Sequence, residues 1–272
     1  MKRRLCIALI AILILTSPVL GAFDRAARAE TEFLLRSPVK DYEILEGVPQ
    51  TDRALGLEEC ARVDDSYFDD AVFIGDSVTL KLNYYVRDHR GANPSLLGKA
   101  QFLTAGSLGS GNAMEPVSKE SLHPSYQGKK MSIEDSVAAM GAKKVFLMLG
   151  MNDIVIYGVE GSAANMIALA KRIRAKSPRC LIFIQSATPR IKGQYKKLNN
   201  NALFEYDLRL YSYCQAYADY GVYFVDVAHV MRDGEDNLPA SYCSDPEDQG
   251  IHFTDIACEA WIDYLYTHAL VR

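Results

Sequence analysis

Ser77 and His252 are the two residues of this sequence whose chemistry could make a nucleophile. Ser77 follows Gly75 and Asp76 at the end of an apolar run, and His252 lies near the C-terminal end. A serine hydroxyl is a poor nucleophile until a base removes its proton, and histidine titrates in the range that suits such a base. If the fold brings the two together, they would form an activated nucleophile.

Two further segments offer donors for the negative charge that acyl transfer places on a carbonyl oxygen. Gly106 lies in the glycine-rich segment 105–112, and Asn152 lies in the segment Gly-Met-Asn-Asp at 150–153. The backbone N–H groups of Ser77 and Gly106 and the side-chain amide of Asn152 are uncharged, so they need no counter-ion. We therefore expect these three residues to form an oxyanion hole.

The elements that must position these residues follow from apolar runs that alternate with helical patterns. Runs bounded by turn residues predict strands at 71–75, 100–104, 144–150, 180–187 and 222–227. Helical periodicity predicts helices at 78–88, 131–140, 162–176, 199–220 and 254–270. Alternating strands and helices indicate an α/β protein with a parallel sheet covered on both faces. Ser77, Gly106 and Asn152 each follow a strand, at the sheet edge where ligands bind in open α/β folds.

Taken alone, the Gly-Asp-Ser tripeptide that ends at Ser77 is also typical of a helix N-cap. The other three segments favour the catalytic interpretation, because a parallel sheet would gather all of them at one edge.

In these four segments the chain resembles the SGNH (GDSL-like) hydrolase superfamily. The four residues that give the family its name correspond to Ser77, Gly106, Asn152 and His252, in the family's order. The resemblance covers residues 67–270. It implies a three-layer α/β/α sandwich with a five-stranded parallel sheet, the flavodoxin-like SGNH hydrolase fold. It also implies ester hydrolysis through an acyl-enzyme, with no metal and no organic cofactor.

The sequence departs from the family at the residue that should orient the histidine. The family's usual acid lies three residues before the histidine, where this chain has Gln249. We predict that Asp248 takes this role through a one-residue extension of the loop, while Asp245 and Glu247 also lie nearby. The alternative is a Ser–His dyad, in which the amide oxygen of Gln249 or a backbone carbonyl holds the tautomer. An acid stabilises both the orientation and the charge of the imidazole, so the choice bears on the rate.

The N-terminal residues form a targeting segment. Three basic residues precede a charge-free run at 5–23, whose strongly apolar part has the length of a signal-peptide h-region. We predict a signal peptide at 1–22; the alternative is an uncleaved anchor, since a bilayer takes about 20 apolar residues to span. Both interpretations export the remainder. An N-terminal spacer at 23–66 and an SGNH hydrolase-like catalytic domain at 67–272 complete the predicted organisation.

Charge and cysteine content exclude several other classes. The formal net charge is −4 and becomes more negative without the basic N-terminus, which argues against a nucleic-acid-binding protein. After the predicted signal peptide the chain has an odd number of cysteines, and none are spaced as in a Cys-x-x-Cys motif. This pattern predicts neither a disulfide framework nor a zinc site. A single bridge that involves Cys60 or Cys243 remains an alternative. The expected partners are a small-molecule or glycan ester substrate, and a membrane only through an N-terminal anchor.

The leading hypothesis is an exported serine esterase that removes small acyl groups, acetyl foremost, from a glycan. The glycan is inferred from export and from polar loops that contain tyrosines. One alternative is an acyltransferase on the same fold, with a sugar hydroxyl in place of water. Another is a non-catalytic glycan-binding pseudoenzyme that has lost the acid, which Gln249 would favour.

Overall fold

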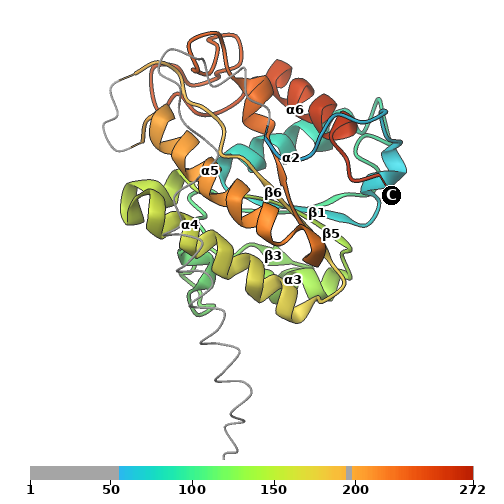
Figure 1. The fold of residues 1–272 in the computed structure, drawn as a ribbon. Helices are drawn as coiled ribbons and strands as arrows, with labels where there is room; N and C mark the ends of the chain where they lie inside the picture. The colour runs from blue at the N-terminus through green and yellow to red at the C-terminus, as the bar shows by residue number, and fades with distance from the viewer. Residues whose placement is uncertain (1–54, 194–197, 272) are drawn as a thin grey trace, which may run out of the picture.

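The structure is a computed structural model that describes residues 55–193 and 198–271, shown in Figure 1. A five-stranded sheet runs through it in the order β2-β1-β5-β6-β7, and every neighbouring pair is parallel. The strands are β1 Ala71–Gly75, β2 Gln101–Thr104, β5 Lys144–Met148, β6 Leu181–Gln185 and β7 Val222–Val225. The predicted five-stranded parallel sheet is confirmed.

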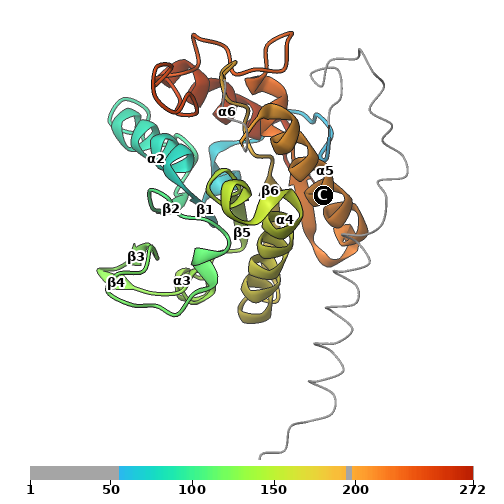
Figure 2. The ribbon, with the colours of Figure 1, turned by 90° about the vertical axis from the view of Figure 1, so that its left-hand side faces the viewer.

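Helices cover both faces of this sheet. They are α2 Ser77–His89, α3 Ile133–Met140, α4 Met151–Lys176, α5 Asn200–Ala216 and α6 Asp255–Thr267. Helices α2 and α6 pack together on one face, and α3, α4 and α5 pack side by side on the other (Figures 1 and 2). A separate two-stranded hairpin of β3 Ser125–Tyr126 and β4 Lys129–Lys130 lies outside the sheet. This arrangement is the predicted three-layer α/β/α sandwich.

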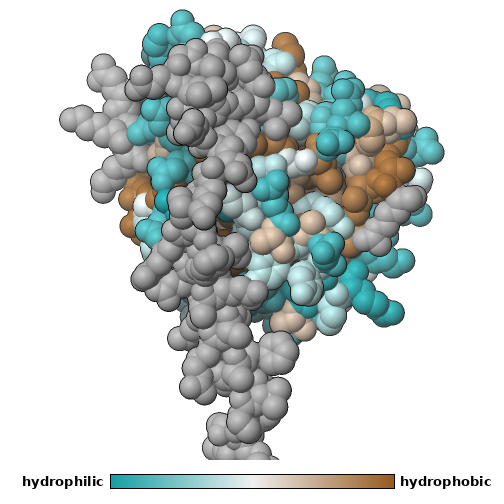
Figure 3. All heavy atoms as spheres, viewed as in Figure 1, coloured by the Kyte–Doolittle hydropathy of each residue, from teal (hydrophilic) through white to brown (hydrophobic). Residues whose placement is uncertain are grey.

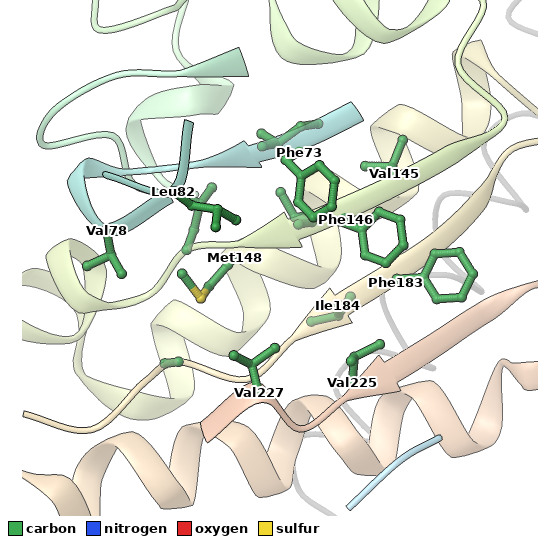
Figure 4. Packing of buried hydrophobic residues seen from close by; sticks show 14 of the residues in the cluster. Phe73, Val78, Leu82, Val145, Phe146, Met148, Phe183, Ile184, Val225 and Val227 are labelled. Atoms are coloured by element: carbon green, nitrogen blue, oxygen red, sulfur yellow. The ribbon is translucent and has the colours of Figure 1, made fainter. Parts of the chain in front are cut away.

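An aromatic ladder fixes the register of the central strands. Phe73, Phe146 and Phe183 are paired across β1, β5 and β6, as Figure 4 shows. Their rings stack with centroids 4.7 Å apart from Phe73 to Phe146 and 4.8 Å apart from Phe146 to Phe183. All three side chains are buried. Because paired aromatic rings stabilise one register over its alternatives, the ladder keeps the central strands aligned.

Helix α4 differs from its prediction at its N-terminal end. It begins at Met151, whereas the helical pattern predicted a start at 162. Gly158, with φ 68° and ψ 177°, interrupts the helix. The turns before it therefore do not continue the helical pattern of the residues after it in the sequence. Asn152 therefore lies in the first turn of a helix, not in a loop.

The first described residues of the predicted spacer pair with the edge strand β7. Gly56 forms an antiparallel bridge with Val225, and the N–H of Leu57 donates to the carbonyl of Phe224 at 2.9 Å. Coverage of this kind blocks the free backbone groups of an edge strand. The predicted signal peptide at 1–22 lies outside the described residues.

Three further observations concern the cysteines, the length of the helices and the surface. In the described ranges, all of Cys60, Cys180, Cys214, Cys243 and Cys258 are free thiols, so neither Cys60 nor Cys243 forms the bridge considered as an alternative. No helix within 55–193 and 198–271 is long and apolar enough to cross a bilayer. On the face seen in Figure 3, hydrophilic and hydrophobic side chains are interspersed wherever grey atoms do not cover them.

Candidate active site

Ser77 is the first residue of α2, directly after the turn that ends β1. A Cβ on Gly75 would lie 2.0 Å from the Thr79 hydroxyl, so only glycine lets the first turn of α2 approach the end of β1 this closely. Asp76 is the N-cap, and its Oδ1 accepts a hydrogen bond from the N–H of Val78 at 2.9 Å. Because Asp76 caps the helix, the Ser77 hydroxyl is not used for capping.

The structure brings Ser77 and His252 together from opposite ends of the domain. Ser77 Oγ lies 2.9 Å from His252 Nε2, and His252 Nδ1 lies 2.7 Å from Oδ2 of Asp245. An ionised carboxylate can only accept, so Nδ1 carries the proton and Nε2 is left to accept from the hydroxyl. This is the hydrogen-bonded geometry of a serine–histidine–acid triad.

The acid of this triad is Asp245, and the prediction that Asp248 orients His252 is wrong. Asp248 is exposed in the loop between the two residues, and its N–H donates to the Asp245 carbonyl at 3.1 Å. Gln249 does not hold the imidazole either; its side chain is exposed and its carbonyl accepts from Arg190. The dyad alternative therefore has no geometric basis.

A hairpin neck explains why the more distant acid reaches the imidazole. The N–H of Ser244 donates to the His252 carbonyl at 2.8 Å, and Cys243 forms an antiparallel bridge with Phe253. These contacts hold the two ends of the loop side by side, with Asp245 and His252 at its neck. Asp248 lies in the loop beyond the neck with its side chain exposed, and Asp245 is the residue bonded to the ring.

The Asp245 carboxylate is itself held in place by donors. Oδ1 accepts from the N–H groups of Ile251 at 3.1 Å and His252 at 2.9 Å, and from the Cys243 thiol at 3.3 Å. Burial acts to raise the pKa of Asp245, but the hydrogen bonds from His252 and Cys243 outweigh it and the pKa is lowered. The carboxylate is therefore charged, as a partner for an imidazolium must be.

The three expected oxyanion donors lie at the start of α2, in the loop after β2 and in the first turn of α4. Within the described residues, the N–H groups of Ser77 and Gly106 have no hydrogen-bond acceptor. Asn152 Nδ2 donates to the Leu108 carbonyl at 3.0 Å and lies 3.4 Å from Asp76 Oδ2. The Asn152 amide thus links the loop that carries Gly106 to the turn that carries Ser77.

Asp153 fixes the glycine-rich segment against the first turn of α4. Its carboxylate accepts from the N–H of Ser110 at 2.8 Å and of Gly111 at 2.9 Å, and the residue is 1 % exposed. A Cβ on Gly109 would come within 2.8 Å of the same carboxylate. The carboxylate therefore sets the path of the loop that bears Gly106.

A second buried acid, Asp76, directly precedes Ser77 in the chain. Burial raises the pKa of Asp76 to about 6, the N–H of Val78 opposes this shift, and the nearby charge of Asp153 adds to it.

The described residues contain no group of three or more His, Cys, Asp or Glu side chains that could hold a metal ion.

Two residues of the site were not among the predicted ones. Asp245 had a usable signal, because an Asp followed by Pro246 favours the start of a turn and so the neck of a loop. Arg190, which contacts the same loop from outside, follows Pro189 with no motif around it. Nothing in its local sequence indicates that contact.

Comparison with known proteins places this geometry in a family. The sequence model of the GDSL-like lipase/acylhydrolase family matches residues 73–259, which is more than half of the chain. A comparison with curated proteins gave no significant match.

Two solved structures share the fold. One is a putative acylhydrolase from Bacteroides fragilis, with a TM-score of 0.53 and 16 % identity over 72 % of this chain and 83 % of that one. The other is a GDSL-like lipase from Bacteroides thetaiotaomicron, with a TM-score of 0.50 and 15 % identity over 75 % of this chain and 88 % of that one. Because the family model matches more than half of the chain and the site residues occur in the expected order, this chain belongs to the GDSL-like lipase/acylhydrolase family.

Proposed function

We propose that the protein is an exported serine esterase that hydrolyses small acyl esters, acetyl foremost, on a glycan. The observation that carries the reaction type is the continuous hydrogen-bonded path from Asp245 through His252 to Ser77, with distances of 2.7 and 2.9 Å. A serine with an oriented base is the arrangement that acyl transfer needs.

The proposed reaction has two halves. Ser77 Oγ attacks the ester carbonyl carbon while its proton passes to His252 Nε2, and the N–H groups of Ser77 and Gly106 with the Asn152 amide stabilise the oxyanion. Collapse breaks the bond to the alkoxide, which takes the proton from His252 and leaves as the alcohol. Water then attacks the acyl-enzyme, again giving its proton to His252, and the acid is released as Ser77 regains its hydrogen.

The small acyl group is supported by the packing beside Asp76, the residue before Ser77. A cavity bordered by Asp76, Val78 and Thr188 has a volume of about 10 Å³. A space of that size holds about one water molecule, so the packing beside Asp76 and Val78 leaves no room for a long acyl chain there.

The glycan and the export are supported by separate features. The basic and apolar N-terminal segment favours export, although it lies outside the described residues. Tyr84 and Tyr157 are each 44 % exposed, and Tyr157 lies in the same helix as Asn152. Rings of this kind present an apolar face with a polar tip, which suits a sugar.

The pseudoenzyme alternative assumed that the acid is missing because Gln249 stands at its usual position. The Asp245 carboxylate lies 2.7 Å from the imidazole, so this support for the alternative is gone. An acyltransferase would use the same residues, so the two activities differ only in the acceptor that enters the second half-reaction.

The test uses the full chain and the Ser77→Ala variant. A fluorophosphonate probe should label the wild type at Ser77, and p-nitrophenyl acetate should be cleaved faster than the butyrate and octanoate esters. Acetylated xylan should release free acetate even with a sugar acceptor present. Turnover that survives Ser77→Ala would reject the nucleophile, and acyl transfer in place of acetate release would favour the transferase.

A further inference from the structure

Arg190 reaches the catalytic loop from a distant part of the chain. It lies in the segment between β6 and α5, 59 positions before Gln249, and is 4 % exposed. Its Nη2 donates to the Gln249 carbonyl at 2.7 Å, and its Nη1 donates to the Leu198 carbonyl at 3.1 Å. One buried guanidinium therefore joins its own segment to the loop between Asp245 and His252 through backbone carbonyls.

The next residue contacts the next carbonyl of the same loop. The N–H of Ile191 donates to the Gly250 carbonyl at 2.9 Å. Gly250 has φ +67°, and a Cβ there would lie 2.5 Å from the Ile191 side chain. Two consecutive residues of one segment thus clamp two consecutive carbonyls of the loop between Asp245 and His252.

The clamp is connected to the triad by short bonds inside the loop. The N–H of Gly250 donates to the Asp245 carbonyl at 3.0 Å. Asp245 Oδ1 accepts from the N–H of Ile251, the residue after Gly250, at 3.1 Å. A shift of residues 249 and 250 would therefore move both the backbone and the carboxylate of Asp245.

Arg190 is itself fixed to the rest of the domain. The N–H of Arg190 donates to Asn200 Oδ1 at 2.9 Å, and the Asn200 amide donates back to the Arg190 carbonyl at 3.0 Å. The same carbonyl accepts from the N–H of Leu238 at 2.9 Å. Since Asn200 opens α5, the clamp is tied to a helix of the sandwich.

We propose that Arg190 is a positioning residue, which holds the loop between Asp245 and His252 so that the carboxylate faces Nδ1 of the imidazole. It touches no reacting atom, and its effect on the rate passes through Asp245. The proposal rests on the proposed esterase function for its kinetic test, while its structural test does not need turnover.

The structural test is the proton NMR signal of the His252 Nδ1–H, which a short bond to a carboxylate moves far downfield. Wild type should show this signal, Asp245→Asn should lose it, and Arg190→Met should lose it or move it upfield. Arg90→Met is the matched control, because Arg90 also donates to backbone carbonyls, those of residues 96, 97, 98 and 100. The control should keep the signal. An unchanged signal in folded Arg190→Met overturns the proposal.

The kinetic test is a double-mutant cycle with p-nitrophenyl acetate. Arg190→Met alone should lower kcat by about 10- to 100-fold and leave KM within about twofold. In an Asp245→Asn background the same change should cost less than about threefold, since the carboxylate that it positions has gone. An equal loss in both backgrounds would mean that Arg190 is merely structural, and would overturn the proposal.

Two further variants keep the test decisive if Arg190→Met does not fold. Arg190→Lys retains the charge but has no planar fork to join two carbonyls, and Gly250→Ala pushes the loop away from Ile191 while Arg190 stays. Both should lower kcat and displace the downfield signal, and failure of both to do so contradicts the clamp. If wild type shows the signal but neither labelling of Ser77 nor turnover, the esterase function fails and the positioning role stands.

Discussion

Asp245 and His252 are seven positions apart in the chain, yet Oδ2 of the acid lies 2.7 Å from Nδ1 of the imidazole. The loop between them folds back on its own backbone, because the N–H of Gly250 donates to the Asp245 carbonyl at 3.0 Å. The two triad residues are thereby neighbours across a hairpin neck. A change in loop length between such positions alters the sequence spacing without altering the contact.

Replacement of Asp245 by asparagine tests this contact. We expect kcat to fall by about 10³- to 10⁴-fold, because an amide can hold the wrong tautomer and does not stabilise the imidazolium. Asp248→Asn is the matched control and should change kcat by less than about threefold. Both are measured with p-nitrophenyl acetate at saturating concentration. A larger loss for Asp248→Asn than for Asp245→Asn would reverse the assignment.

Asn152→Ala should remove one oxyanion donor. The expected loss is about 10²- to 10³-fold in kcat with little change in KM, since the charge on the oxygen develops after binding. Asn93→Ala is an exposed control near the far end of α2, and should leave both constants unchanged. If kcat of Asn152→Ala stays within threefold of wild type, the amide serves only to join the loops.

Asp153→Asn should loosen the glycine-rich segment. One of the two backbone donors at Ser110 and Gly111 would then face an amide N–H₂ group in place of a carboxylate oxygen. A buried donor left without an acceptor costs about 1–3 kcal/mol of unfolding free energy. We expect a lower Tm together with a lower kcat, because Gly106 lies on the same segment. A drop in Tm with unchanged kcat would show that the segment tolerates movement.

Asp76 should make stability depend on pH. Its pKa is about 6 in the folded chain, while an unfolded Asp titrates near 3.9, so the folded state binds this proton more tightly. The resulting stabilisation is complete below about pH 4 and is lost as the pH rises through about 6, a change of about 3 kcal/mol. Asp76→Asn, which keeps a capping side chain, should not show this loss.

Urea unfolding between pH 4 and pH 7 measures the effect. The variant should gain stability relative to wild type as the pH rises, whereas exposed Asp248→Asn should run parallel to wild type. Parallel curves for Asp76→Asn would show that Asp76 titrates normally.

Phe146→Ala should destabilise the domain by removing a ring from the centre of its core. The ring stacks between Phe73 and Phe183, so its removal leaves a cavity in the sheet core, with an expected cost of about 3–5 kcal/mol in unfolding free energy. Chemical denaturation gives the value. Phe102→Ala, on the partly exposed outer strand β2, should cost less.

The sequence by itself determined the sheet and the place of four residues on it. Strands of buried β-forming residues and the turns that follow them are local patterns, so Ser77, Gly106 and Asn152 could be assigned to one sheet edge without coordinates. His252 could be assigned to the turn before the last helix in the same way. The residue types then indicated acyl transfer, because few side chains can serve as a neutral hydrogen-bond donor or as a base near neutral pH.

Tertiary structure alone decided which acid faces His252. The pairing of Cys243 with Phe253 closes the neck of this loop, and Arg190 contacts the loop from 59 positions away in the chain. Contacts of that range leave no periodicity and no motif in the chain, so counting back from the histidine selected Asp248. The start of α4 was hidden for a related reason, since Gly158 interrupts the helical pattern although residues both before and after it are buried in the core.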